Sequence, residues 1–385
     1  MARRTRPGYH SRMNACSSLY VHIPFCERKC HYCDFYSLGN REPELLEQFA
    51  TALRLEAGLV ARERGPAPPY RLDTVYIGGG TPTLLAPHVL ETALNPILSE
   101  ARHGADFEWT IEANPSSVDK AKLLAYRKLG INRVSLGIQS LAPELLARLG
   151  RIHTREIAIR ALDEIFCAGF ENVSVDFLCG VPGQSISTLE ESIQEALRFP
   201  IKHLSCYLLT LPSDHPMHQE LPNEEEQLEH LLWIDHFLES AGFEHYEISN
   251  FAKPGWKSRH NMNYWNGQSY LALGPSAHSF DSERFIRAKN VSSLSDYYEA
   301  LHSGRRPIEW REELTPTQRE IEKWLLALRL SEGIAEEHFD TQRRQQMLAA
   351  FESQGLIISH PVLAGRKRLT PKGFALSDQI IPSFI

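Results

Sequence analysis

The sequence lacks several features that would each indicate a broad class of protein. No run of apolar residues approaches the ~20 that a membrane-spanning helix needs, so we do not expect an integral membrane protein. An excess of positive charge is also absent, because 41 Lys and Arg stand against 48 Asp and Glu. The resulting net charge of -7 argues against a protein built mainly to bind nucleic acid. What remains is a globular chain of 385 residues, long enough for one large domain and a smaller one.

The cysteines do not form the framework of a small secreted protein. Four of the seven stand alone in the sequence: Cys16, Cys167, Cys179 and Cys206. Disulfide-stabilised domains instead carry an even set of closely spaced pairs. We therefore predict a reducing compartment and a cytoplasmic location.

The first twenty residues are basic and contain no acid. They hold Arg3, Arg4, Arg6 and Arg12. A mitochondrial targeting segment has this composition. We favour a flexible extension over residues 1–17, and Met13 offers a second translation start besides Met1.

Short apolar runs alternate with amphipathic helical patterns from residue 18 to about 240. The runs are rich in β-branched residues and are followed by Gly, Pro or Asn, which is typical of buried parallel strands. The predicted strands are 18–25, 73–79, 106–114, 132–140, 172–180 and 202–211. The predicted helices are 43–63, 86–102, 116–129, 143–168, 187–199 and 223–241.

The unusual residues follow one predicted strand after another instead of gathering near a single strand. Ligands of a barrel collect in this way, at the carboxyl ends of many consecutive strands. We therefore predict an α/β protein with a partial (β/α)6 TIM-like barrel over residues 18–242. A strand and loop extension over 243–312 and a C-terminal winged-helix-like α+β domain over 313–385 complete the predicted organisation. The few basic residues of that last domain do not favour DNA binding in an acidic chain.

Three cysteines lie within eight residues of the loop that follows the first strand: Cys26, Cys30 and Cys33. Iron–sulfur clusters are held by cysteine thiolates, usually four to a cubane. Three protein ligands would leave one iron open to a small molecule. A zinc site of three cysteines with His22 or His31 is the alternative, although the sequence has no second distant ligand pair.

The second predicted strand runs into the loop "GGGTPT", residues 78–83. Glycines without Cβ let the backbone approach a ligand closely, and Pro82 suits the start of a helix. A tight turn without any ligand would need the same residues and is the alternative interpretation. A ligand-binding loop is favoured because this loop lies at the same end of the sheet as the cysteines.

These motifs together resemble the radical S-adenosylmethionine superfamily, and the words "YVHIPFC", "EANP", "GIQS" and "VDFLCGVPGQ" resemble its coproporphyrinogen-oxidase-like branch. The resemblance implies that Cys26, Cys30 and Cys33 bind a [4Fe–4S] cluster whose open iron chelates S-adenosylmethionine. It further implies that this cofactor is contacted by Tyr20, Tyr32, Gly79, Gly80, Thr81, Glu112, Gln139, Arg151 and Asp176.

Two functions are compatible with that branch. An oxygen-independent coproporphyrinogen III oxidase would carry a fourth cysteine where Phe35 stands, and a longer segment before the cluster loop. The words "HNMNYW" resemble the signature of the HemW group of heme-binding chaperones. That resemblance implies heme ligation by His260, with Met262 as the other conceivable ligand, and packing by Tyr264 and Trp265.

The HemW resemblance is therefore our functional hypothesis, with heme delivered to acceptor hemoproteins such as respiratory proteins at the membrane. Nucleic acid is not an expected partner. A homodimer, and radical chemistry itself, stay open alternatives at this point.

Overall fold

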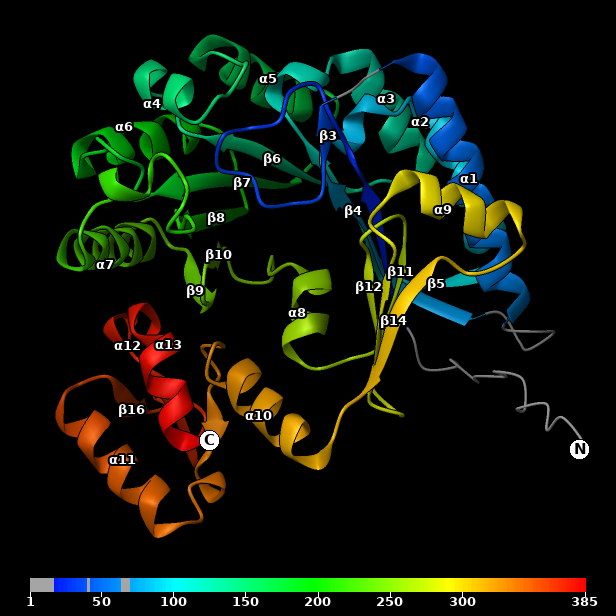
Figure 1. The fold of residues 1–385 in the computed structure, drawn as a ribbon. Helices are drawn as coiled ribbons and strands as arrows, with labels where there is room; N and C mark the ends of the chain where they lie inside the picture. Colours follow the sequence, from blue (N-terminus) through cyan, green and yellow to red (C-terminus); the bar gives the residue numbers. More distant parts are fainter. Residues whose placement is uncertain (1–16, 40–41, 64–69) are drawn as a thin grey trace, which may run out of the picture. The chain divides into compact units, whose positions relative to one another are not determined.

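The computed structural model describes residues 17–39, 42–63 and 70–385 (Figure 1). The predictions for the N-terminal arginines, Cys16 and the alternative starts Met1 and Met13 fall outside the described residues. The chain divides into two compact units. The first comprises residues 1–27, 35–109 and 268–313, and the second comprises residues 28–34, 110–267 and 314–385.

The first unit is built on the N-terminal strands of the predicted barrel. β1 (Ser18–Ile23) pairs in parallel with β4 (Tyr70–Gly79) on one side and with β11 (Tyr270–Leu273) on the other. The antiparallel strands β12 (His278–Asp281), β13 (Ile286–Asn290) and β14 (Ile308–Glu313) extend the sheet beyond β11. The helices of this unit are α1 (Pro43–Glu63), α2 (Pro87–Leu98) and α9 (Leu294–His302).

The second unit continues the parallel order. β5 (Ala101–Ala113) runs from the first unit into the second, where its end pairs with β6 (Arg133–Gln139). β7 (Asn172–Cys179) and β8 (His203–Leu208) follow in parallel, and β10 (Asn250–Ala252) and β9 (Glu244–Glu247) close the edge antiparallel. The six predicted strands thus occur as β1, β4, β5, β6, β7 and β8, in chain order across the sheet. This arrangement confirms the predicted partial α/β barrel.

The helices between these strands lie close to their predicted positions, with one correction. The second unit holds α3 (Lys120–Leu129), α4 (Pro143–Arg148), α5 (Arg155–Cys167), α6 (Ile186–Ala196) and α7 (Glu224–Ser240). The single helix predicted over 143–168 is wrong, because the chain leaves the helix after Arg148 and Gly150 adopts a left-handed φ of 71°. Thr154 then caps α5. The break creates the loop that carries Arg151.

The segment around "HNMNYW" also differs from its prediction as strand and loop. Residues Arg259–Trp265 form helix α8, whose first turn is capped by the Ser258 hydroxyl. Asn261, Asn263 and Asn266 are weak helix formers, and their density in the sequence hid this helix. The helix places His260 and Tyr264 one turn apart on the same face.

The C-terminal part contains the helices and the hairpin that the sequence predicts. They are α10 (Pro316–Ala327), α11 (Gln342–Ser353), β16 (Ile357–Ser359), β17 (Arg366–Leu369), α12 (Pro371–Ala375) and α13 (Ser377–Ile380). The short strand β15 (Ile334–Ala335) pairs with β17. Its core includes Trp324, stacked on Phe384 with ring centroids 5.2 Å apart. The winged-helix-like designation stays a prediction.

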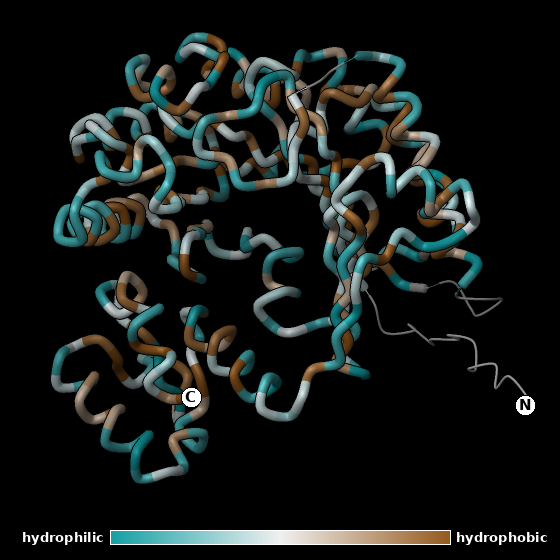
Figure 2. Tube along the Cα trace, viewed as in Figure 1, coloured by the Kyte–Doolittle hydropathy of each residue, from teal (hydrophilic) through white to brown (hydrophobic). Residues whose placement is uncertain are grey.

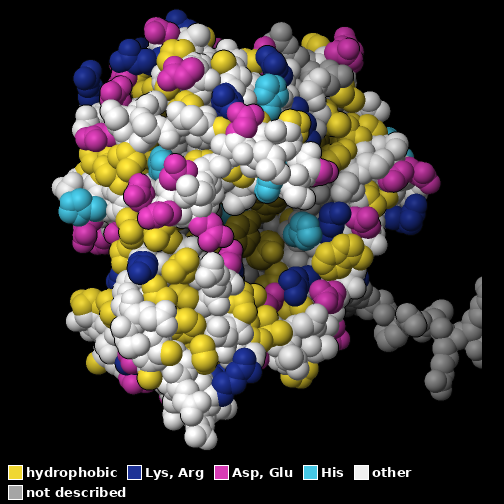
Figure 3. Space-filling model, turned by 60° about the vertical axis from the view of Figure 1, so that its left-hand side comes forward, with side chains coloured by type: hydrophobic (Ala, Val, Ile, Leu, Met, Phe, Trp, Pro, Cys, Tyr) yellow, Lys and Arg dark blue, Asp and Glu magenta, His cyan; other side chains and the backbone are white. Residues whose placement is uncertain are grey.

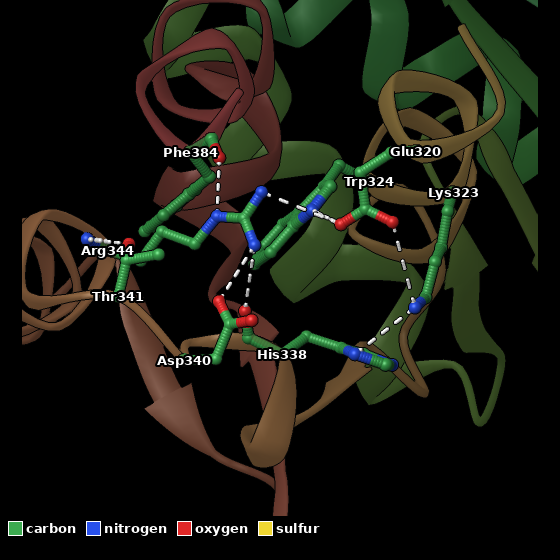
Figure 4. Close-up of polar contacts among 8 residues, drawn as sticks. All are labelled: Glu320, Lys323, Trp324, His338, Asp340, Thr341, Arg344 and Phe384. Atoms are coloured by element: carbon green, nitrogen blue, oxygen red, sulfur yellow. Dashed lines mark hydrogen bonds and ion pairs between the residues drawn. The ribbon is translucent and has the colours of Figure 1, made fainter. Parts of the chain in front are cut away.

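The basic residues of this part bind the chain itself. Arg344 donates from Nε to the Phe384 carbonyl at 2.9 Å, lies 3.0 Å from Asp340 and stacks over Trp324 (Figure 4). Lys367 contacts Glu352 at 2.7 Å. Acidic and basic side chains are interspersed on the face of the molecule in Figure 3. These contacts give the basic residues a structural role within the C-terminal part.

The helices show the amphipathic alternation that the sequence predicts, with hydrophilic and hydrophobic residues interleaved along their length in Figure 2. Within the described residues, no helix is both long and apolar enough to cross a membrane.

Candidate functional site

The cysteine loop begins at β2 (Phe25–Cys26), directly after β1. Cys26 is buried, whereas Cys30 and Cys33 are half-buried, and none of the three forms a disulfide. Cys26 belongs to the first unit, and Cys30 and Cys33 belong to the second. No three His, Cys, Asp or Glu side chains among the described residues are gathered into a ready-made metal site, so cluster ligation by these cysteines stays a prediction.

The glycine loop packs directly on Cys26 within the first unit. The Thr81 hydroxyl donates to the Cys26 sulfur at 3.6 Å. A Cβ atom on Gly80 would lie 3.0 Å from that sulfur and 2.5 Å from the carbonyl oxygen of Phe25. Gly79 has a φ of 114°, and a Cβ there would meet the His22 ring at 2.7 Å. The glycines are therefore needed for close approach, as the sequence predicted.

His22 is held by two hydrogen bonds in the same unit. Its Nε2 lies 2.8 Å from the Tyr36 carbonyl oxygen, which can only accept, so Nε2 carries the proton. Its Nδ1 therefore accepts from the Tyr20 hydroxyl at 3.0 Å. Burial lowers the pKa of His22, which keeps the ring neutral. Because both ring nitrogens are engaged, His22 is not available as the zinc ligand of the alternative interpretation in this structure.

Tyr20 is thereby fixed in orientation, and its ring also stacks on Tyr76 with centroids 6.3 Å apart. Tyr20 lies within β1, and Cys26, Gly79, Gly80 and Thr81 end or follow the adjacent parallel strands β1 and β4. The first unit thus brings together its share of the predicted cofactor residues.

Arg151 organises the corresponding part of the second unit. Its guanidinium donates to the Cys30 sulfur at 3.4 Å, to the Asn114 side chain at 2.8 Å and to the Gly137 carbonyl at 2.6 Å. The resemblance implied that Arg151 contacts S-adenosylmethionine, whose carboxylate its charge can pair with, and did not predict the contact with Cys30. A positive charge beside a sulfur favours the thiolate, which is the form that binds metal.

Tyr32 lies among the same groups. Burial raises its pKa, the charge of Arg151 acts against this rise, and the charges of Cys30 and Cys33 add to it. The Tyr32 ring packs against an apolar cluster that includes Leu145 and Leu149. It is therefore fixed beside the two cysteines of the second unit.

Of the remaining predicted contacts, Glu112 and Gln139 stand at the carboxyl ends of β5 and β6, and Asp176 lies within β7. Asp176 is opposite Gly137 in the sheet, and Glu112 is opposite Ser135. Burial raises the pKa of Asp176, although the surrounding serine hydroxyls and a buried arginine lower it in part. Gln139 has a φ of 68°, a strained value for a residue with a side chain, and such strain is common at ligand sites.

The histidine of the α8 motif is buried inside the second unit. His260 is 1 % exposed, and its Nε2 lies 2.7 Å from the Tyr264 hydroxyl. The two rings meet edge-on at 87° with centroids 4.9 Å apart. Burial and a nearby arginine, Arg133, lower the pKa of His260 to about 3, so its imidazole is neutral. Met262 is half-buried on the same short helix.

Trp265 takes part in a different contact from the other two predicted heme residues. Its side chain donates a hydrogen bond to Glu247, a carboxyl that is 1 % exposed. Burial raises the pKa of Glu247 to about 7. The sequence analysis missed Glu247 and Arg133. Arg133 gave one signal, a charged residue at the start of an apolar strand, whereas the polar strand that ends at Glu247 gave none.

A six-unit partial α/β barrel with a CxxxCxxC loop after its first strand and a glycine loop after the next defines a radical S-adenosylmethionine protein. The model of the Radical SAM superfamily matches residues 20–196. The heme chaperone HemW of Bacillus subtilis is 30 % identical over 383 residues, which cover 96 % of this chain and 99 % of that protein. The HemW of Mycobacterium tuberculosis is 32 % identical over 379 residues, with 95 % and 94 % covered. The chain belongs to the HemW family.

The coproporphyrinogen III oxidase HemN of Escherichia coli shares the fold. Its structure superposes with a TM-score of 0.82 at 22 % identity, covering 97 % of this chain and 91 % of that one. The cofactors of the radical S-adenosylmethionine superfamily are a [4Fe–4S] cluster and S-adenosylmethionine. The residues present fit such a cluster chemically. One loop supplies three thiols outside disulfides, the Thr81 hydroxyl donates to the sulfur of Cys26, and the Arg151 guanidinium donates to the sulfur of Cys30.

Proposed function

We propose that the protein is a heme chaperone that binds heme and passes it to acceptor hemoproteins. The observation that carries this proposal is the likeness to HemW proteins over almost the whole of both chains. The chemistry of α8 supports it, because a neutral imidazole is the form of histidine that ligates heme iron. His260 would supply that ligand, while Tyr264 and Trp265 would pack against the macrocycle.

The cofactor site is proposed residue by residue. Cys26, Cys30 and Cys33 would hold the [4Fe–4S] cluster. S-adenosylmethionine would be bound by Tyr20, Tyr32, Gly79, Gly80, Thr81, Glu112, Gln139, Arg151 and Asp176. The contacts of Thr81 with Cys26 and of Arg151 with Cys30 support this assignment, since each joins a predicted cofactor residue to a predicted cluster ligand. When bound, the two cofactors together supply one-electron chemistry.

We also propose a cytoplasmic protein whose acceptors include membrane-associated respiratory hemoproteins, acting as a monomer or homodimer. The domain limits of 18–242, 243–312 and 313–385 are part of this proposal. Mass spectrometry of the hemoproteins that copurify after crosslinking would identify the acceptors.

The other candidate function is oxygen-independent coproporphyrinogen III oxidase. The likeness to the HemN structure favours it only at the level of the fold. Against it stands Phe35, which occupies the position of the oxidases' additional cysteine and is 67 % exposed.

The test combines two measurements on anaerobically reconstituted protein. Hemin titration of the wild type should give a Soret spectrum of a histidine-ligated heme, and His260→Ala should lose that spectrum. Efficient decarboxylation of coproporphyrinogen III by the wild type would show that the protein is an oxidase and would contradict the chaperone proposal. Full iron and sulfide content in Cys30→Ala would contradict the cluster ligands.

A further inference from the structure

Arg133 is a buried cation inside the second unit. It is the first residue of β6 and is 2 % exposed. Side chains alternate between the two faces of a strand, so Arg133 shares the face of Ser135, whose hydroxyl donates to Asp176. Val134 and Leu136, on the other face, are fully buried in the apolar core. Arg133 therefore points to the side of the sheet on which the predicted cofactor residue Asp176 of β7 lies.

The Nε of the Arg133 guanidinium has no acceptor. This nitrogen is buried and has no hydrogen-bond partner among the residues that the structure describes. An arginine carries five donors and is always charged. A buried charge without a hydrogen-bonded partner is one of the most costly arrangements in a protein. Such a group indicates an anion that the bound state supplies.

One carboxylate interacts electrostatically with Arg133 without pairing with its Nε. This carboxylate is Asp176, whose oxygens accept from the Ser135 hydroxyl at 3.2 and 3.3 Å. The charge of Arg133 also acts to lower the pKa values of His203, Tyr246 and His260. Both histidine rings are neutral, so neither balances the positive charge. His260 of α8 thus lies within the electrostatic influence of the Arg133 guanidinium.

We propose that Arg133 anchors a carboxylate of the bound ligand, and that this carboxylate is a propionate of the heme whose iron His260 ligates. The inference rests on the proposed heme function and names a second point of attachment for the same cargo. The planar fork of arginine matches a carboxylate with two parallel hydrogen bonds. S-adenosylmethionine also carries a carboxylate, but Arg151 is the cation assigned to that group, and the experiment separates these two sources.

The experiment compares hemin with hemin dimethyl ester, which keeps the iron and macrocycle but has no free carboxylate. Both ligands are titrated in one buffer into full-length wild type, Arg133→Met, Arg133→Lys and Arg155→Met. Arg155→Met is the control, because Arg155 is an exposed arginine of α5 whose partner is Glu195 at 2.7 Å. The affinity for S-adenosylmethionine and the melting temperature of ligand-free protein are measured for each variant.

We expect the wild type and Arg155→Met to prefer hemin over its ester by on the order of ten- to a hundredfold, the range for a hydrogen bond to a charged group. Arg133→Met should abolish the preference, and Arg133→Lys should reduce it. The melting temperature of ligand-free Arg133→Met should be no lower than that of the wild type, because an apolar side chain replaces an uncompensated charge. A purely structural arginine would instead lower it.

A preference for hemin that survives in Arg133→Lys and in Arg133→Met overturns the proposal. If Arg133→Met does not fold, a preference that is unchanged in Arg133→Lys is sufficient to overturn it. A weaker affinity for S-adenosylmethionine with unchanged hemin preference assigns the anchor to that cofactor and overturns the propionate assignment. If the wild type binds neither hemin nor its ester, the proposed function itself is overturned. This result differs from failure of the propionate proposal, in which the wild type still binds hemin.

Discussion

The hydrogen bond between Tyr264 and His260 competes directly with heme. It occupies Nε2 of His260, the nitrogen that would ligate iron from this side of the ring, at a distance of 2.7 Å. Ligation through Nε2 therefore requires the Tyr264 hydroxyl to leave. Tyr264→Phe removes this competition and keeps the aromatic ring for packing against the macrocycle.

The size of the effect follows from the value of one buried hydrogen bond. A typical intramolecular hydrogen bond contributes about 0.5–1.5 kcal/mol net, so its removal should tighten hemin binding by roughly two- to tenfold. The ligand-free protein should lose about 1 kcal/mol of stability, because the His260 nitrogen then lacks this hydrogen-bond partner. Tyr264→Phe should therefore bind hemin more tightly than the wild type and be less stable without it.

The assay is a hemin titration followed at the Soret band, combined with chemical denaturation of ligand-free protein. Tyr297→Phe is the matched control, since Tyr297 is a fully buried tyrosine whose hydroxyl donates to Glu56 at 2.7 Å. It should lose stability without any change in hemin affinity. Weaker hemin binding by Tyr264→Phe would refute the reasoning, because the hydroxyl would then assist the bound state.

Three further predictions follow from single groups. Gly80→Ala should destabilise the protein by about 1–3 kcal/mol and lower its reconstituted iron and sulfide, because the new Cβ would lie 2.5 Å from the Phe25 carbonyl; Gly58→Ala, with its nearest neighbour at 3.7 Å, is the control. The wild type should lose about 3 kcal/mol of unfolding free energy relative to Glu247→Gln as the pH rises from 4.5 to 7. The sign follows because a carboxyl with a raised pKa binds its proton more tightly when folded, and that contribution is lost as pH rises through about 7; equal pH profiles would contradict it. Hemin affinity should be flat from pH 8 to about pH 5, since protons do not compete for His260 until the pH approaches its pKa of about 3, whereas a decline near 6.5 would show an exposed histidine ligand.

The strands were predictable because parallel strands are buried on both faces and read as continuous apolar runs. The break within 143–168 was not, since Leu149 and Ile152 keep the apolar pattern going across it. Only the left-handed backbone of Gly150 reveals the loop that carries Arg151 to Cys30. A single glycine in a helical pattern is too weak a signal to predict such a break.

The candidate site was predictable where its residues form contiguous motifs and not where it depends on tertiary packing. The cysteines, the glycine loop and His260 belong to or lie beside characteristic sequence motifs. Arg133 and Glu247 lie outside those motifs. Their importance comes from burial without full hydrogen bonding, which no local sequence pattern encodes. His260 was predicted as a ligand, but its hydrogen bond to Tyr264 could be expected only once α8 is known to be a helix.

Helix α8 is anchored in a way that suits a movable element. Of its seven residues only His260 is fully buried, so displacing the helix exposes little apolar surface. The contacts that hold it include the Ser258 cap, the Tyr264 to His260 hydrogen bond and the contact of Trp265 with Glu247. Each of these three is replaceable by water or by a bound ligand, whereas a leucine at position 260 would have to be pulled from the core. Under the proposed heme ligation, the one buried side chain of α8 would therefore help to hold the helix in place without cargo and would serve as a ligand when cargo binds.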